Sequence, residues 1–279
     1  MNRTHLFFLA LVLSVLGFSS VYFIFSVSTE ASVTVLNTNA PPKLQCHQEL
    51  NTLSIDNEGQ LDVLVWNIYK QNRPNWHEVL TSLSQSRQLI LLQEASMTDS
   101  FKGWLIEKGW QGNQVEAFKA LDVSSGVLTI ATESPSLACA YLVVEPWLRL
   151  PKSALFSLYS LSDGQQLAVV NIHAVNFTYG VVEYQQQLDV LAKALLQHEG
   201  PIIFAGDFNS WSHERMDELA EYLQPLGLVA ASFRPDNRKQ FVNGLALDHI
   251  FYRGLTLKKA EAPHSDASDH NPLLVSFSL

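Results

Sequence analysis

The sequence predicts an α/β fold in which sheets are covered by helices. Short apolar runs typical of buried strands alternate along the chain with segments of helical periodicity. Some apolar runs follow one another without a helix between them, as adjacent strand pairs would. With 47% hydrophobic and 16% charged residues, the 279-residue chain has enough apolar side chains for a sizeable core. This mixed order favours layered sheets over a simple barrel.

The N-terminal region contains a long apolar run. Residues 6–25 read LFFLALVLSVLGFSSVYFIF, 20 residues without a charge, and a helix of that length spans about 30 Å of hydrocarbon. Residues 1–5 carry an arginine, whereas residues 26–60 carry one lysine against four carboxylates. This asymmetry predicts a cytoplasmic N-terminus (1–5), a membrane anchor or cleaved export signal (6–25) and a catalytic domain outside the cytoplasm. A cytoplasmic protein is the alternative if the run does not insert.

A linker and one domain are expected after this run. Residues 26–60 contain Pro41-Pro42 and few large apolar groups, a composition typical of a tether. Residues 61–279 show no repeat and have a suitable length for one compact domain.

The expected strands of this domain are its short apolar runs, at 61–66, 88–92, 126–131, 154–159, 167–172, 201–206, 248–252 and 272–277. Helices are expected in several gaps. One begins near Pro74, another follows Thr98 and ends at Gly109, a third carries Leu188 with Leu191 and Leu195, and a fourth follows Ser212.

Polar residues of the types used in catalysis follow or precede these strands. They are Asn67, Gln93, Glu94, His173, Asp207, Asn209, Asp248, Asp269 and His270. Each alone has a simpler interpretation, because asparagine and aspartate form turns and a single histidine is commonly structural. Their repeated occurrence at strand ends favours a shared site at one rim of the sheets.

The chemistry of these side chains suits a phosphoester hydrolase. Glu94 and Asp269 offer hard oxygen ligands for Mg²⁺ or Mn²⁺, with substrate and water completing the shell. Asp248 next to His270 would orient the imidazole. Asp207 and Asn209 would orient or deprotonate a water and donate to a developing oxyanion.

The motifs VWNIYK, LLQEA, VVNIHAVNF, AGDFNSW, LDHIFY and SDHNPLLVSFSL resemble the endonuclease/exonuclease/phosphatase superfamily, in the order which that family requires. The resemblance covers about residues 61–279, and GDFN and SDH are its most specific elements. NIYKQ, KSALFSLY and SDHNPLLV further resemble a bacterial group typified by YafD.

The resemblance implies a deoxyribonuclease I-like fold, a four-layered α/β sandwich with two mixed β-sheets face to face and helices outside. It implies that Asn67 and Glu94 help to hold Mg²⁺ or Mn²⁺, with Asp269 as a further ligand or an orienting acid. His270 would contact the scissile phosphate or act as a base, with Asp248 fixing its tautomer, while Asp207 and Asn209 would handle the nucleophilic water and the phosphoryl oxygens. His173 matches the nuclease, inositol phosphatase and sphingomyelinase branches, but no acidic partner for it is evident. Lys152 could contact phosphate, although we expect an ordinary surface residue.

Three functions follow from the resemblance. The first is a metal-dependent phosphodiesterase acting on nucleic acid, although a net charge of −9 disfavours tight non-specific binding to a polyanion. Arg234, Arg238 and Lys239 form the one modest basic cluster, with a solvated loop as its simpler interpretation. The second is hydrolysis of a lipid headgroup or small phosphate ester by a membrane-associated domain. The third is a non-catalytic binding module. Cys46 and Cys139 lack metal-site spacing and form at most one disulfide or remain two thiols, and the sequence makes no prediction of oligomeric state.

Overall fold

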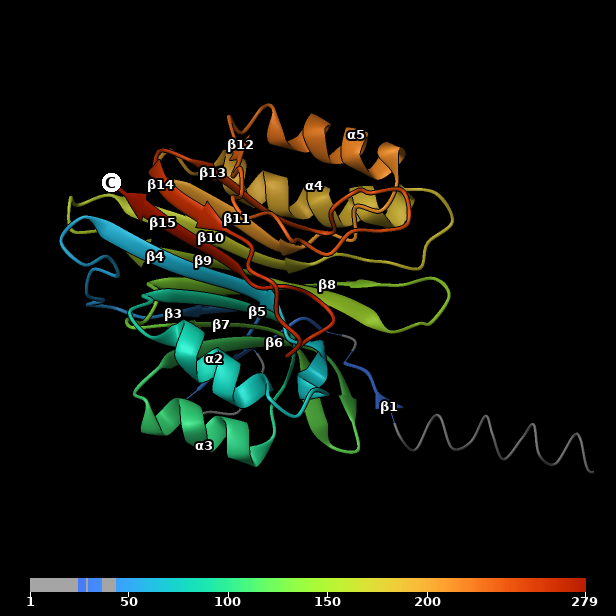
Figure 1. Ribbon diagram of the computed structural model, residues 1–279, viewed down its shortest axis with the longest axis horizontal. Coiled ribbons are helices and arrows are strands. Elements are labelled where there is room, and N and C mark those ends of the chain that lie inside the picture. The colour runs from blue at the N-terminus through green and yellow to red at the C-terminus, as the bar shows by residue number, and fades with distance from the viewer. Residues whose placement is uncertain (1–24, 29, 37–43) are drawn as a thin grey trace, which may run out of the picture.

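Two β-sheets form the centre of the molecule in the computed structural model, which describes residues 25–28, 30–36 and 44–279 (Figure 1). The first sheet has the strand order β1 (Phe25–Ser26), β6 (Gln111–Ala120), β7 (Val123–Ala131), β5 (Leu89–Ser96), β4 (Gln60–Asn67), β15 (Leu273–Ser278) and β14 (Thr256–Glu261), and β2 (Val33–Val35) also pairs with β6. The second has the order β12 (Val229–Ala230), β13 (Asp248–Arg253), β11 (Ile202–Asp207), β10 (Gln166–His173), β9 (Pro151–Ser160), β8 (Leu137–Val144) and β3 (Cys46–Gln48).

Helices cover the outer face of each sheet. The pair α2 (Trp76–Ser84) and α3 (Asp99–Glu107) lies on the first sheet, and α4 (Val182–Leu196) with α5 (His213–Leu223) lies on the second (Figure 1). Both sheets are mixed, since β4 pairs with β5 and β10 with β11 in parallel among antiparallel neighbours. The predicted four-layered α/β sandwich is therefore confirmed.

The strands carry continuous apolar runs because both faces of each sheet are buried. In β4, Leu61, Val63 and Val65 belong to the core between the sheets, whereas Leu64 and Trp66 pack under α2 and α3. This two-sided burial explains why the run LDVLVW lacks the polar alternation of a half-exposed strand. It also fixes the register, because a slip by one residue would exchange the two faces.

The segment expected to be a linker is partly built into the sheets. In residues 26–60, β2 pairs with β6, β3 pairs with β8, and Ile55 is buried between the sheets. Backbone pairing at a sheet edge requires few apolar side chains, so a low apolar content did not exclude strands here. The predicted anchor or signal, residues 6–25, lies outside the described residues except for its last residue, Phe25. Within the described ranges, no helix is both long and apolar enough to cross a membrane.

A disulfide fastens this N-terminal segment to the second sheet. Cys46 in β3 and Cys139 in β8 are register partners and are bonded to each other across 93 residues of sequence. Of the two states that the sequence allowed, the structure contains the disulfide.

We expect the double variant Cys46→Ser, Cys139→Ser to lose about 2–5 kcal/mol of unfolding free energy, because a cross-link over so long a loop restricts the unfolded chain. Urea denaturation checks this value. Dithiothreitol should lower the wild-type midpoint and leave the double variant unchanged. Equal midpoints for the oxidised wild type and the variant would contradict the stabilising role of the bond.

Candidate active site

A cavity of about 410 Å³ opens where the strands of both sheets end, and it gathers most of the predicted residues. Seven of them line it: Asn67, Glu94, His173, Asp207, Asn209, Asp269 and His270. Of the remaining two, Asp248 lies directly behind His270, and Gln93 lies between the sheets. The fold therefore places residues that are up to 203 positions apart in the sequence, from Asn67 to His270, around one cavity, as their positions at strand ends predicted.

Strand register places three of these side chains in a row. His173, Asp207 and Asp248 are paired neighbours at the ends of β10, β11 and β13. Gly206 makes this close pairing possible, because its φ is +141° and an added Cβ would lie 2.0 Å from the carbonyl oxygen of Ile172. The glycine of GDFN thus has a steric function beside the aspartate that follows it.

Local irregularities direct two other residues to the cavity. Glu94 lies in a β-bulge between Leu92 and Ala95 and has a φ of +52°. Asn209 has a φ of +47° just after β11. Left-handed backbone at non-glycine residues costs free energy and is concentrated at functional sites, and a bulge turns a side chain away from the regular pleat. Gln93, by contrast, is fully buried and donates to Asn171 Oδ1 of the opposite sheet at 2.7 Å, so it braces the sheets.

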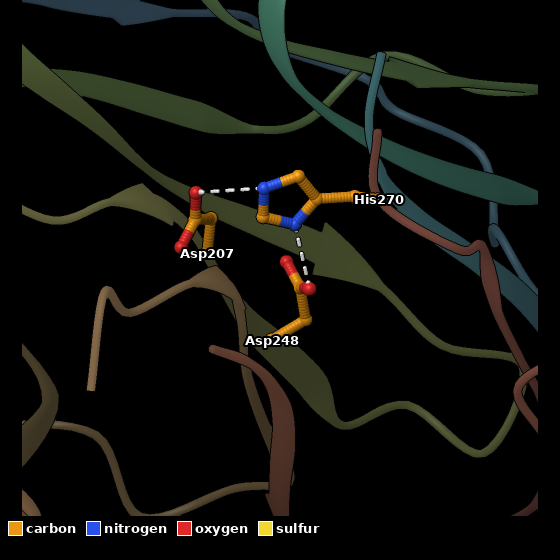
Figure 2. A group of neighbouring side chains, drawn as sticks. All are labelled: Asp207, Asp248 and His270. Carbon is orange, nitrogen blue, oxygen red and sulfur yellow. Dashed lines mark hydrogen bonds and ion pairs between the residues drawn. The ribbon is translucent and has the colours of Figure 1, made fainter. Parts of the chain in front are cut away.

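The imidazole of His270 lies between two buried carboxylates (Figure 2). Its Nδ1 is 2.7 Å from Asp248 Oδ2, and its Nε2 is 3.9 Å from Asp207 Oδ2. Burial alone would lower the pKa of His270, but the negative charges of Asp248 and Asp207 outweigh burial and raise it well above the ordinary value. The ring is therefore a cation at neutral pH, with Asp248 fixing its orientation.

Asp207 is the acceptor at the centre of the group. Its Oδ2 accepts from Asn67 Nδ2 at 3.0 Å and its Oδ1 from the backbone N–H of Asn209 at 2.9 Å. Burial raises the pKa of Asp207, and nearby Asp248 raises it further, while the His270 cation opposes this. A carboxylate with a raised pKa is a better proton acceptor than a solvent-exposed one.

His173 has a lysine as its direct partner. Lys152 Nζ lies 2.9 Å from His173 Nε2, and Glu94 and Asp207 oxygens are farther away at 3.8 and 3.6 Å. Burial and, next, the positive charge of Lys152 lower the pKa of His173 well below its ordinary value. The neutral ring therefore accepts a hydrogen bond from the Lys152 ammonium group. The expectation that Lys152 is an ordinary surface residue is wrong, since it lines the cavity.

The oxygen donors of the cavity fit a divalent cation. Asp269 Oδ1 is buried and has no hydrogen-bond partner among the described residues. Glu94 pairs with Lys70 through Oε2 and leaves Oε1 on the side of His173. A separate group, Asp207, Asp248 and His270, places ligand-type atoms within 4.8 Å of one another, but the imidazole Nδ1 there already bonds Asp248. Asn67, Glu94 and Asp269 also line the cavity and offer oxygen atoms of the type that a hard cation binds, although Asn67 Oδ1 accepts from the backbone N–H of Tyr69 at 3.1 Å.

Two supporting residues were not predicted from the sequence. Glu145 is 1% exposed, accepts from the backbone N–H of Asn176 at 2.6 Å and lies 4.0 Å from Lys152 Nζ. Arg215 is fully buried and bonds the loops that carry Asn176 and Asn209. The spacing of Arg215 with Leu219 and Leu223 on α5 was an available signal, because residues four apart share a helix face.

Comparisons with known proteins agree with this geometry. A model of the endonuclease/exonuclease/phosphatase family matches residues 64–270. A UPF0294 protein of Vibrio campbellii is 56% identical over 273 residues, which cover 98% of this chain and 97% of the relative. The human Nocturnin catalytic domain with bound sulfate has a TM-score of 0.59 at 18% identity, covering 82% of this chain and 96% of its own. ANGEL2, described as a 2',3'-cyclic phosphatase, has a TM-score of 0.60 at 14% identity, with 84% and 98% covered.

The two structural neighbours show that the fold is shared. The family model and the Vibrio relative also show to which family the chain belongs. The model spans most of the predicted domain, from β4 to the His270 loop, and thus covers every residue of the cavity group from Asn67 to His270. The chain belongs to the endonuclease/exonuclease/phosphatase family.

Proposed function

We propose that the protein is a divalent-metal-dependent hydrolase of phosphodiesters. The observation that carries this proposal is that Asp269, whose Oδ1 is buried and has no hydrogen-bond partner among the described residues, lines the same cavity as the Asp207–His270 pair. One bound substrate could therefore contact both a metal held by Asp269 and the proton acceptor Asp207. The structural neighbours support this proposal, because the Nocturnin domain binds a sulfate anion and ANGEL2 is described as a cyclic phosphatase.

The residues have separate roles in this proposal. Asn67, Glu94 and Asp269 would hold Mg²⁺ or Mn²⁺, which when bound supplies positive charge that polarises a phosphoryl oxygen. Asp207 accepts the proton of the attacking water, and the Asn209 backbone N–H holds its carboxylate in place. The His270 cation, oriented by Asp248, donates to the oxygens that gain charge.

Lys152 and His173 form the opposite wall. The lysine charge, held by the neutral His173 ring and lying 4.0 Å from Glu145, faces the space where a phosphate would bind. A fixed ammonium group is a common phosphate contact in proteins. His173 is therefore proposed as the residue that positions Lys152.

The location of the domain is proposed on two grounds. The apolar run 6–25 carries the predicted orientation with the domain outside the cytoplasm. The Cys46–Cys139 disulfide is independent support, because such bonds persist in oxidising compartments.

Removal of divalent metal should abolish turnover. The full chain is treated with EDTA, dialysed and assayed with bis-p-nitrophenyl phosphate before and after Mg²⁺ or Mn²⁺ is added back. We expect activity to fall to the background rate and to return with the metal, because the cavity oxygens need a cation to bind phosphate. Full activity after chelation would contradict the metal assignment.

A further inference from the structure

Exposed apolar side chains surround the mouth of the cavity. They belong to three segments, 144–150, 175–182 and 239–247, which we call the mouth loops. Each loop contributes one exposed side chain to the cavity wall, namely Leu148, Phe177 and Phe241. Each also presents a further apolar side chain outside the wall: Trp147 is 53% exposed, Tyr179 is 77% exposed and Val242 is 96% exposed. Apolar residues gathered at one functional opening mark an interaction surface.

The mouth loops are braced in this exposed arrangement. Glu145 accepts from the backbone of Asn176, which joins the first two loops, and the rings of Trp147 and Tyr179 lie 4.6 Å apart. The third loop is joined through Trp211, whose ring is 5.9 Å from Phe241 and whose Nε1 donates to Asn176 Oδ1 at 2.9 Å. The structure thus holds these side chains at the surface although burial would be favourable.

The charge of the mouth loops differs from that of the chain as a whole. They contain Arg149, Lys239 and one carboxylate, Glu145, which is buried, whereas the whole chain carries −9. The mouth is therefore apolar with a small positive excess and no exposed carboxylate. Such a surface complements a bilayer, where tryptophan and tyrosine favour the interface.

The same surface is poorly suited to a nucleic acid. Binding a polyanion requires several free cations, but two of the three residues in the predicted basic cluster have partners within the protein. Arg238 pairs with Asp236 at 2.8 Å, and Lys239 Nζ donates to the backbone oxygen of Asp269 at 2.9 Å.

The apolar N-terminal run reaches the domain beside the mouth. Phe25 is its last residue, and the Phe25 ring lies 5.9 Å from Phe118, which lines the cavity. β1 lies at the same end of the molecule as the β8–β9 turn (Figure 1). If residues 6–25 enter a bilayer as the sequence predicts, the cavity opens close to that bilayer.

We propose that the mouth loops dock on a phospholipid bilayer and that the cavity hydrolyses the phosphodiester of a lipid headgroup; this rests on the proposed function. Trp147, Tyr179 and Val242 enter the interfacial region and bring the headgroup to the cavity. Water bonds to phosphorus, the bond from phosphorus to one of the two alcohols breaks, and that alcohol takes a proton, which gives a phosphomonoester.

The test compares two substrates with the full chain, so that residues 1–25 are the same in every variant. One substrate is vesicles of equal parts phosphatidylcholine and phosphatidylglycerol, and the other is soluble bis-p-nitrophenyl phosphate. The variants are the double Trp147→Ala, Tyr179→Ala and the single Val242→Asp. Their matched control is Ile106→Asp, because Ile106 is an exposed apolar residue on α3, outside the mouth loops and the cavity wall.

We expect the ratio of the vesicle rate to the soluble-ester rate to fall about tenfold in both mouth variants, since each loses apolar contact with the bilayer. Ile106→Asp should keep the wild-type ratio. An unchanged ratio in the mouth variants overturns the docking proposal. Intact vesicles in the presence of a hydrolysed soluble ester overturn the lipid assignment and leave the proposed function standing. Wild type inactive on every ester would instead overturn the proposed function itself.

Discussion

Asp207→Asn is expected to lower the turnover of a phosphodiester by about a thousandfold or more, because the variant lacks the proton acceptor at the centre of the site. The substitution keeps one side-chain oxygen for the N–H of Asn209, which Asp207 Oδ1 accepts at 2.9 Å. It also removes a buried charge near Asp248. The new amide N–H replaces the oxygen that accepts from Asn67 Nδ2 at 3.0 Å, so we expect a loss of about 1–3 kcal/mol of unfolding free energy, with the fold retained.

Steady-state kinetics on bis-p-nitrophenyl phosphate and urea denaturation together test this prediction. Asp163→Asn is the matched control, since Asp163 is exposed on the β9–β10 turn and does not line the cavity. Near-wild-type turnover of Asp207→Asn would remove this residue from the reaction. Loss of folding together with activity would assign it a structural role instead.

Arg215→Met is expected to cause the largest loss of stability, about 3–5 kcal/mol, because it leaves several buried oxygen atoms without a donor. The Arg215 guanidinium has no salt bridge to a described carboxylate. Its Nη1 donates to the carbonyl oxygens of Val175 and Asn209 at 2.6 and 3.0 Å, and its Nη2 donates to Asn176 O and Thr178 Oγ1 at 3.0 and 2.8 Å. Aromatic rings of Tyr184 and Trp211 lie on the guanidinium at 4.7 and 4.6 Å.

A comparison of two cations makes this prediction specific. Lys193 pairs with Asp189 on the exposed surface of α4, and Lys193→Met should change stability little because exposed ion pairs contribute little. Arg215→Lys should fall between wild type and Arg215→Met, since an ammonium group cannot reproduce the planar fork. Urea midpoints order the four proteins. Equal stability of Arg215→Met and Lys193→Met would contradict the role of Arg215 in joining the two loops.

The sequence predicted the fully buried strands well and the edge strands poorly. Runs such as 61–66 and 167–172 became β4 and β10 because burial on both faces demands continuous apolar residues. β6 and β14 were missed, since QGNQVEAFKA and TLKKAE are polar segments, and β8 was missed although LACAYLVV is mostly apolar. β14 lies at the edge of the first sheet, where backbone pairing needs few apolar side chains, whereas β6 lies beside the short strands β1 and β2 and buries the polar side chains of Asn113 and Gln114.

Helix starts were predicted where a side-chain cap exists. Thr98 Oγ1 accepts from the Phe101 N–H at 3.3 Å and begins α3 as expected. Near Pro74, α2 begins only at Trp76, after Asn75, whose side chain makes no capping bond. Pro74 therefore lies two residues before the helix and is not its first residue.

Some residues of the candidate site could be predicted from the neighbouring sequence, whereas others are brought there only by the tertiary fold. Asn67, His173 and Asp207 could be predicted because each follows an apolar strand directly in the sequence. The partners of Lys152 and Glu145 could not be predicted, because only the pairing of β9 with β10 brings Lys152 to His173, and only the meeting of two loops brings Glu145 to Asn176. The pairing of Lys70 with Glu94 depends on left-handed backbone at Tyr69 and Lys70, which residue type does not disclose.

The most direct test of the central claim is hydrolysis of bis-p-nitrophenyl phosphate in water labelled with oxygen-18, using the full chain with Mg²⁺ or Mn²⁺. The claim is that Asp207 accepts a proton from water that attacks phosphorus in this cavity. We expect the label in the p-nitrophenyl phosphate product and not in p-nitrophenol, with the labelled product lost in Asp207→Asn and after EDTA. Label in p-nitrophenol, labelled phosphate formed equally by Asp207→Asn, or no turnover by the wild type with either metal would contradict it.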